Sequence, residues 1–173
     1  NFTDPDSQVM RKSQSSAYTQ SYNAQATVDA DGSQLIVGHH IGECSNDKRE
    51  LIKAYQSIPP EIGKPTHQLA DAGYANTTYI EELEAATDVD LYISVHREDA
   101  HDERQYNYRP EEKLKKSKPK AIHPTLQKMQ AKLETAEGKA IYKLRSQTVE
   151  TTFGIIKEAM GYRNLLLRGA EKI

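Results

Sequence analysis

A strand, a helix and a second strand follow one another within residues 66–95, and this order constrains the fold more than any other feature. Residues 66–71 predict a short strand, Thr77 is suited to cap a helix over residues 79–86, and residues 89–95 predict another strand. Two strands with a helix between them pair in parallel through a crossover connection. The sequence therefore predicts an α/β fold.

Polar residues come first in the chain, and a β-hairpin follows them. Residues 1–17 are rich in serine and contain an Asp-Pro-Asp segment, which is typical of an exposed lead-in. Residues 21–29 alternate apolar and polar side chains, as a half-buried strand does. Residues 29–32 (DADG) favour a turn, and residues 34–41 predict the second strand of the hairpin.

Helices are expected in two further parts of the chain. Asp47 is suited to cap a helix over residues 48–57. Residues 97–124 are polar, rich in lysine and without periodicity, so we expect an inserted loop there. A helical pattern returns over residues 125–160, with an interruption expected near Gly138.

Residues 142–157 (YKLRSQTVETTFGIIK) have the pattern of one long amphipathic helix. Glu150 and Lys157 lie seven residues apart, so they project from nearly the same side of a helix. A carboxylate beside a cation could bind a metal ion next to a phosphate group, but an ordinary surface helix with solvated charges would look the same. The expected apolar stripe contains Leu144, Val149, Phe153 and Ile156.

Charge is distributed unevenly along the chain. Residues 1–103 carry 7 Lys and Arg against 18 Asp and Glu, whereas residues 104–173 carry 16 against 7. A basic half favours a polyanionic partner over a small neutral substrate. Attraction between the two halves of the protein explains the same pattern, and composition alone leaves both explanations open.

Cysteine content and hydropathy exclude several classes of protein. Cys44 is the single cysteine, so the chain has no internal disulfide framework, and no Cys/His cluster has zinc spacing. No apolar run approaches membrane-spanning length, and the first residues lack the basic and apolar regions of a signal peptide. These features predict a protein of a reducing cytoplasm that does not interact with membranes.

Several short motifs occur in a fixed order along the chain. Residues 22–29 (YNAQATVD) and 35–38 (LIVG) form the expected hairpin, and residues 70–74 read ADAGY. The late helix carries a tyrosine, an arginine, a glutamate and a lysine with two, four and six residues between them, at Tyr142, Arg145, Glu150 and Lys157. Residues 153–157 (FGIIK) and 165–169 (LLLRG) complete the set.

In this order and spacing the motifs resemble bacterial insertion-sequence transposases of the DDE type, and the likeness covers nearly the whole chain. It implies that residues 1–173 form a partial catalytic domain with a ribonuclease H-like fold. That fold is a mixed sheet with flanking helices, in the order of three antiparallel strands, a helix, a strand that carries an aspartate, a fifth strand and a late helix that carries a glutamate. The lysine-rich residues 97–124 match least.

The resemblance also implies which residues act. Asp71 matches the second catalytic carboxylate and Glu150 the third, and both would be metal ligands. Relatives often have three residues between the arginine and the glutamate, but this chain has four. The extra residue turns Arg145 by about 100° around a helix, so its role is less secure than that of Lys157. The DNA-binding residues expected on this basis are Tyr142, Arg145, Lys157, Arg163 and Arg168.

The chemistry of phosphodiester cleavage explains why carboxylates are needed. Cleavage requires an activated oxygen nucleophile and a neutralised leaving oxygen, and two divalent ions held by carboxylates supply both. We therefore expect Mg²⁺ or Mn²⁺ as cofactor, and Lys and Arg side chains that hold the DNA backbone. Transposon ends and target DNA are the implied partners, in a nucleoid-associated protein that could form a homodimer at full length.

The family's first catalytic aspartate has no match in this sequence. Asp4 and Asp6 lie in a proline-containing segment without a strand pattern, and Asp29 ends the strand that matches the family's second. The resemblance places the first aspartate upstream of Asn1, on a central strand. We therefore expect a fragment that lacks this strand and has an incomplete metal site.

Three functions are compatible with the sequence. The first is the catalytic domain of a DNA transposase, which cleaves DNA and transfers strands with the help of a divalent ion. The second is a truncated, inactive remnant that still binds nucleic acid. The third is a metal-dependent nuclease of similar fold without strand-transfer activity. An aspartate in a short apolar strand before Asn1 would favour an enzyme, and a start codon there would favour the remnant.

Overall fold

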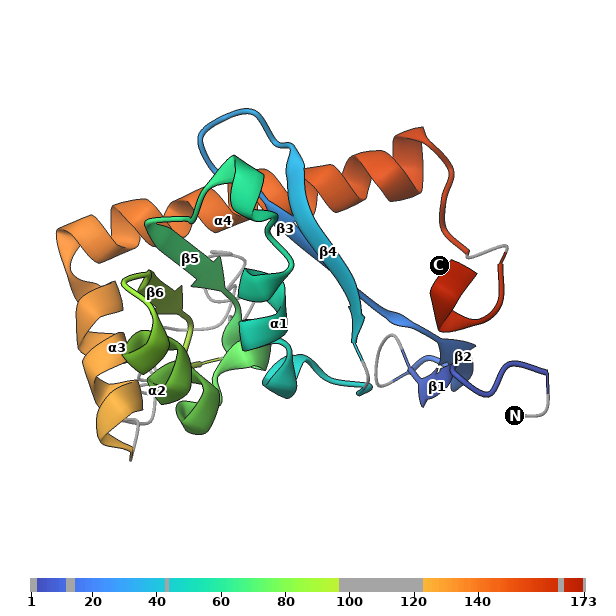
Figure 1. Ribbon diagram of the computed structural model, residues 1–173, viewed down its shortest axis with the longest axis horizontal. Helices are drawn as coiled ribbons and strands as arrows, with labels where there is room; N and C mark the ends of the chain where they lie inside the picture. Colours follow the sequence, from blue (N-terminus) through green and yellow to red (C-terminus); the bar gives the residue numbers. More distant parts are fainter. Residues whose placement is uncertain (1–2, 12–14, 43, 97–122, 165–166, 173) are drawn as a thin grey trace, which may run out of the picture.

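The computed structural model describes residues 3–11, 15–42, 44–96, 123–164 and 167–172. Within these ranges the strands form three separate two-stranded sheets, flanked by helices (Figure 1). The predicted α/β class is confirmed, but the described strands do not join into one mixed sheet. Most of the predicted loop, residues 97–122, lies outside the described residues.

Strands β5 (His67–Ala70) and β6 (Asp90–Ile93) pair in parallel, as the sequence predicts. Helix α2 (Thr77–Ala86) connects them as the crossover. The N-cap of this helix is Asn76, whose side chain accepts a hydrogen bond from the Thr78 amide, so the predicted cap at Thr77 was wrong by one residue. An Asn side chain at this position satisfies one of the free amides of the first turn.

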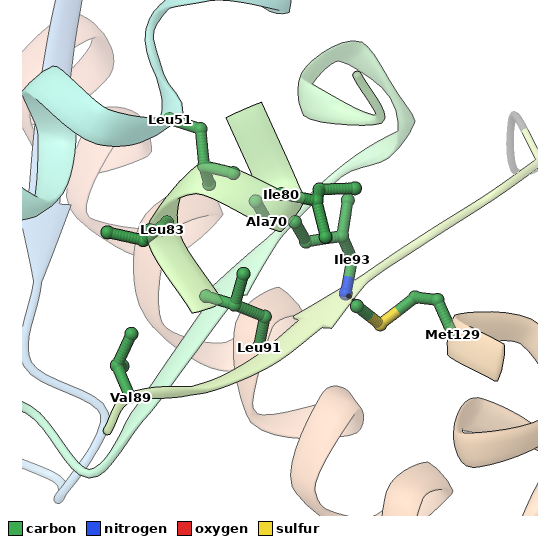
Figure 2. Close-up of a cluster of buried hydrophobic side chains, with 8 residues drawn as sticks. All are labelled: Leu51, Ala70, Ile80, Leu83, Val89, Leu91, Ile93 and Met129. Carbon is green, nitrogen blue, oxygen red and sulfur yellow. Dashed lines mark hydrogen bonds between the residues drawn. The ribbon is translucent and has the colours of Figure 1, made fainter. Parts of the chain in front are cut away.

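The hydrophobic core surrounds this parallel pair. Helices α1 (Leu51–Gln56), α2 and α3 (Pro124–Glu134) contribute to it together with β5 and β6. Met129 of α3 closes one side, and its sulfur accepts a 3.4 Å hydrogen bond from the Ile93 amide. Figure 2 shows the eight buried side chains that make up this cluster: Leu51, Ala70, Ile80, Leu83, Val89, Leu91, Ile93 and Met129.

A 3₁₀ turn, Asp47–Arg49, precedes α1, and its cap differs from the prediction. The side chain of Asn46, not that of Asp47, accepts a hydrogen bond from the Lys48 amide. The Asp47 carboxylate accepts hydrogen bonds from β3 instead. A second 3₁₀ turn, Pro60–Ile62, follows α1.

The predicted hairpin forms from β3 (Asn23–Val28) and β4 (Ile36–Gly42), which pair antiparallel. Gly32 in the turn has a φ of 87°, a conformation that an L side chain rarely adopts. The register shifts at Thr27/Val28, next to this turn.

The first residues are more ordered than the sequence predicts. Strand β1 (Gln8–Met10) pairs antiparallel with β2 (Thr19–Ser21), so residues 1–17 are not simply an exposed lead-in. Asp4 is only 9% exposed. Its position depends on contacts with residues far along the chain, which local sequence patterns do not reveal.

A hydrogen-bonded junction joins this early segment to the late LRG motif. The Tyr22 hydroxyl donates to Asp4 Oδ1 at 2.5 Å and accepts from the Gly169 amide at 3.0 Å. The Ala170 amide donates to Asp6 Oδ2 at 3.1 Å. A short 3₁₀ turn, Ala170–Lys172, follows the junction. In Figure 1 the two chain ends accordingly lie at the same end of the molecule.

Helix α4 (Ala136–Gly154) runs past β5 and β3 as the long orange helix of Figure 1. The break from α3 falls at Thr135, three residues before Gly138 and thus near the predicted position. Thr135 Oγ1 accepts a hydrogen bond from the Gly138 amide and caps α4. A Cβ on Gly138 would lie 2.1 Å from the Lys132 carbonyl oxygen, so a glycine is needed for this close approach.

The end of the late helix also differs from the prediction of a single helix. A π-helical segment, Ile155–Ala159, follows α4 and carries Lys157. Gly161, with a φ of 75°, then ends the helical chain as expected.

Leu91→Ala should lower the free energy of unfolding by about 2–5 kcal/mol, because Leu91 has no exposed surface and its truncation leaves a cavity beside β5. Leu35 is 64% exposed, so Leu35→Ala is the matched control and should change stability by less than about 0.5 kcal/mol. Urea unfolding followed by circular dichroism measures both. Equal effects would contradict the placement of the core.

Candidate active-site cleft

A cleft of about 860 Å³ separates the β3–β4 hairpin from the β5–β6 pair. Consecutive residues of both segments line it, from Asn23 to Asp31 and from Ile62 to Asp71. Among the described residues β3 pairs with β4 alone and β5 with β6 alone. The other edges of β3 and β5, with their backbone hydrogen-bonding groups, therefore face each other across this cleft.

Helix α4 supplies the remaining wall. The apolar residues of the predicted stripe that line the cleft are Leu144, Val149 and Phe153. Arg145 and the buried Thr148 line it from the same helix. The amphipathic pattern of residues 142–157 thus reflects packing of the predicted apolar stripe against the two sheets.

Asp71 lies in this cleft, directly after the last residue of β5. Its Oδ1 accepts a 2.7 Å hydrogen bond from the Gly73 amide. Asp71 thereby caps a 3₁₀ turn over Ala72–Tyr74. The side chain is exposed. A carboxylate at the end of a strand, held by its own turn and open to solvent, is available to a ligand.

Glu150 lies on α4 but is not among the residues that line the cleft. Its side chain is 64% exposed, and its Oε1 lies 3.6 Å from a guanidinium nitrogen of Arg145. The structure thus brings Asp71 and Arg145 to one cleft, with Glu150 beside it on the helix.

The five expected DNA-binding residues divide into two groups. Tyr142 and Arg145 are half-buried on α4, with the guanidinium 5.6 Å from the centre of the tyrosine ring. Lys157, Arg163 and Arg168 are exposed and follow the end of α4. The Lys157 ammonium lies 5.1 Å from the Phe153 ring centre, and Arg163 pairs with Glu158.

Sequence reasoning missed a polar network beside Asp71. The Gln25 amide donates to Asp47 Oδ1 at 2.7 Å and accepts a hydrogen bond from the Tyr74 hydroxyl. Asn23 donates to the same Asp47 oxygen at 3.0 Å. The strand pattern placed Asn23 and Gln25 on the polar face of a hairpin, but the sequence carries no signal that Asp47 and Tyr74 meet them.

The electrostatic environment of Tyr74 is unusual. Burial, and then the nearby carboxylates of Asp47, Asp71 and Glu50, raise the pKa of the Tyr74 phenol well above its ordinary value of 10.0. The hydroxyl is therefore protonated at any physiological pH and is fixed as a hydrogen-bond donor.

The described residues do not build a complete metal centre. No group of three or more His, Cys, Asp or Glu side chains among them could hold a metal ion. Asp71 is available, whereas Glu150 lies next to Arg145. The carboxylates present in the described part therefore do not fit a two-metal site on their own. No described helix is long and apolar enough to cross a membrane.

Comparison with known proteins identifies one family. The family model described as a transposase DDE domain matches residues 2–173. No curated protein and no solved structure matches the chain.

The raised pKa of Tyr74 makes part of the stability dependent on pH. A folded pKa above the unfolded value means that this contribution is fully present below about pH 10 and is lost as the pH rises from there through the folded pKa. The stability difference between wild type and Tyr74→Phe should therefore be constant from about pH 7 to 9 and shrink above about pH 10. Urea unfolding at each pH measures it, and a difference that stays constant up to pH 11 would contradict the assignment.

Proposed function

Because the chain belongs to the transposase DDE domain family, we propose that it forms most of the catalytic domain of a DNA transposase. The family acts in transposition-related DNA cleavage, and DNA is its substrate. The observation that carries the proposal for this chain is the position of Asp71, which follows a parallel strand and opens into the cleft beside α4.

The active fold in this proposal is a ribonuclease H-like sheet in which one more strand fills the cleft between β3 and β5. Two facing sheet edges and an apolar wall from α4 support it, because unpaired backbone groups are costly unless water or another strand satisfies them. The sheet order would be β4, β3, the added strand, β5 and β6. The added strand would also carry the first catalytic aspartate.

Asp71 and Glu150 are the proposed metal-binding carboxylates of this chain. Carboxylate oxygens are the ligands that Mg²⁺ and Mn²⁺ prefer, and bound ions of this kind stabilise the charge that develops on the phosphate during cleavage. Glu150 follows Val149, which lines the cleft, and its exposed side chain would have to turn away from Arg145 to take part in metal binding.

Phosphate contacts are assigned to the exposed cations that follow α4: Lys157, Arg163 and Arg168. Arg145 is a weaker candidate, because its side chain is 15% exposed and lies between the Tyr142 ring and Glu150. The extra residue between Arg145 and Glu150, relative to the family pattern, also favours a weaker role for Arg145.

A second candidate function is a DNA-binding remnant that does not cleave. The lack of a three-carboxylate group among the described residues favours it. The two candidates differ in whether a version extended by an Asp-bearing strand gains activity, and they agree on DNA binding.

DNA binding should be weak, independent of sequence and steeply dependent on salt, because released counterions dominate contacts to phosphates. Substituting Lys157, Arg163 or Arg168 by alanine should each reduce the salt slope of binding by about 1. Arg145→Ala should have a smaller effect, and Lys128→Ala, which removes an exposed lysine of α3, is the matched control. Fluorescence anisotropy of a labelled duplex at several salt concentrations measures these slopes. An affinity that stays flat between low and moderate salt would exclude this mode of binding.

The chain itself should show little or no Mg²⁺-dependent cleavage, because its described carboxylates do not complete a metal site. A version extended upstream by an Asp-bearing strand should nick a labelled transposon end. In that version Asp71→Asn or Glu150→Gln should abolish nicking but leave DNA affinity within about twofold, since each removes a ligand charge and no phosphate contact. Undiminished nicking by either variant would show that the wrong residues have been named.

A further inference from the structure

In the described part of the chain, the turn that carries Asp71 is hydrogen-bonded to β3 through side chains alone. Tyr74, the last residue of the turn, donates its hydroxyl proton to the Gln25 carbonyl oxygen. The Gln25 amino group donates in turn to Asp47 Oδ1 at 2.7 Å. β3 and β5 are not paired with each other, so this chain of hydrogen bonds spans one end of the cleft.

The Gln25 side-chain amide has one favoured orientation in this series of hydrogen bonds. Gln25 is 9% exposed, and its amino group also donates to Asn23 Oδ1 at 2.7 Å. A flipped amide would place its carbonyl oxygen against the Asp47 carboxylate and its amino group against the Tyr74 hydroxyl. The first contact would set two acceptors against each other, and in the second the Tyr74 hydroxyl would no longer donate to Gln25. The Asp47 carboxylate therefore determines the orientation of the Gln25 acceptor that holds Tyr74.

Close packing adds a second link between Asp47 and the turn. A Cβ on Gly73 would lie 2.8 Å from Asp71 Oδ1 and 3.2 Å from Asp47 Oδ2. Gly73 thus leaves room for both carboxylates beside its Cα, while its amide donates to Asp71 Oδ1. A displacement of Asp47 or Tyr74 would be transmitted directly to the residue that orients Asp71.

We propose that Tyr74 and Asp47 are positioning residues for Asp71: they hold the 72–74 turn against β3, and the turn holds the carboxylate. This inference rests on the proposed function for its catalytic consequence, although the geometric part is independent of it. The raised pKa of the phenol supports the proposal, because Tyr74 keeps its hydroxyl proton, and so its donor, throughout the physiological pH range. With Oδ1 occupied by the Gly73 amide, Asp71 presents its Oδ2 to a ligand in a fixed direction.

The first test measures the turn itself. Tyr74→Phe removes the hydroxyl but keeps the ring, and it should speed hydrogen exchange of the Gly73 amide by about three- to tenfold, the factor that corresponds to one lost hydrogen bond. Tyr79→Phe is the matched control, because the Tyr79 ring also packs against the core and its hydroxyl has no hydrogen bond to a described residue. Amides of β6 report global unfolding. Unchanged exchange at Gly73 in Tyr74→Phe would overturn the proposal, regardless of the protein's function.

A conservative pair at Asp47 separates positioning from a direct role of its charge. Asp47→Asn keeps an oxygen that can accept from Gln25 and Asn23, and it should leave exchange at Gly73 close to that of wild type. Asp47→Ala removes the acceptor and should match Tyr74→Phe. Exchange at Gly73 as fast in Asp47→Asn as in Asp47→Ala would show that the charge is what matters, and wild-type exchange in both would show that Asp47 has no role. Either result would overturn the positioning role of Asp47.

The catalytic consequence is tested in the version extended by an Asp-bearing strand. Tyr74→Phe should lower the kcat of nicking by about tenfold while the KM for DNA is unchanged, since misplacement of a catalytic group affects the transition state more than binding. Wild-type kcat in Tyr74→Phe with faster Gly73 exchange would overturn the catalytic part. If the extended wild type does not nick at all, the proposed function fails, and the exchange experiment still decides whether Tyr74 and Asp47 position Asp71.

Discussion

Mutual burial of Leu51, Ile80, Leu91 and Ile93 is the interaction on which the rest of the structure depends. All four side chains have no exposed surface, and they come from α1, α2 and β6. Their contact fixes the crossover that makes β5 and β6 parallel, and so determines where β5 ends and Asp71 begins. Apolar burial of this kind is the largest favourable term in folding, and it is here concentrated in one half of the molecule. The β3–β4 hairpin contributes little to it, and its position depends on packing against α1 and α4 and on polar contacts.

The polar contacts have a different role from the core. Between β3 and the Asp71 turn the structure places buried or half-buried amides, a phenol and a carboxylate that have directional requirements, whereas apolar side chains tolerate small shifts. A network of this type contributes modest net stability, but it specifies one geometry. The core therefore stabilises the fold, and the network determines how the β3–β4 hairpin and the β5–β6 pair are oriented at the cleft.

Local patterns predicted most elements but not their assembly. The parallel pair, the hairpin and the late helix follow from periodicities of two and 3.6 residues and from turn residues, which are properties of neighbours in sequence. Asn46 and Asn76 replaced the expected caps because several adjacent residues are competent caps and tertiary contacts choose among them. The position of Asp71 at the end of a strand was predictable for the same local reason. Its partners were not, because Gln25 and Tyr74 are 49 residues apart and meet only after the sheets are in place.

The junction between residues 4–6 and 169–170 has a mechanical consequence. It connects segments 165 residues apart by hydrogen bonds from two backbone amides to two carboxylates. While these bonds hold, tension applied to the chain outside the junction passes across it and does not load the sheets or the core between. Once these bonds break, the load reaches β1, β2 and the segment that follows α4. The junction is therefore the contact that must break first when the two ends of the domain are pulled apart.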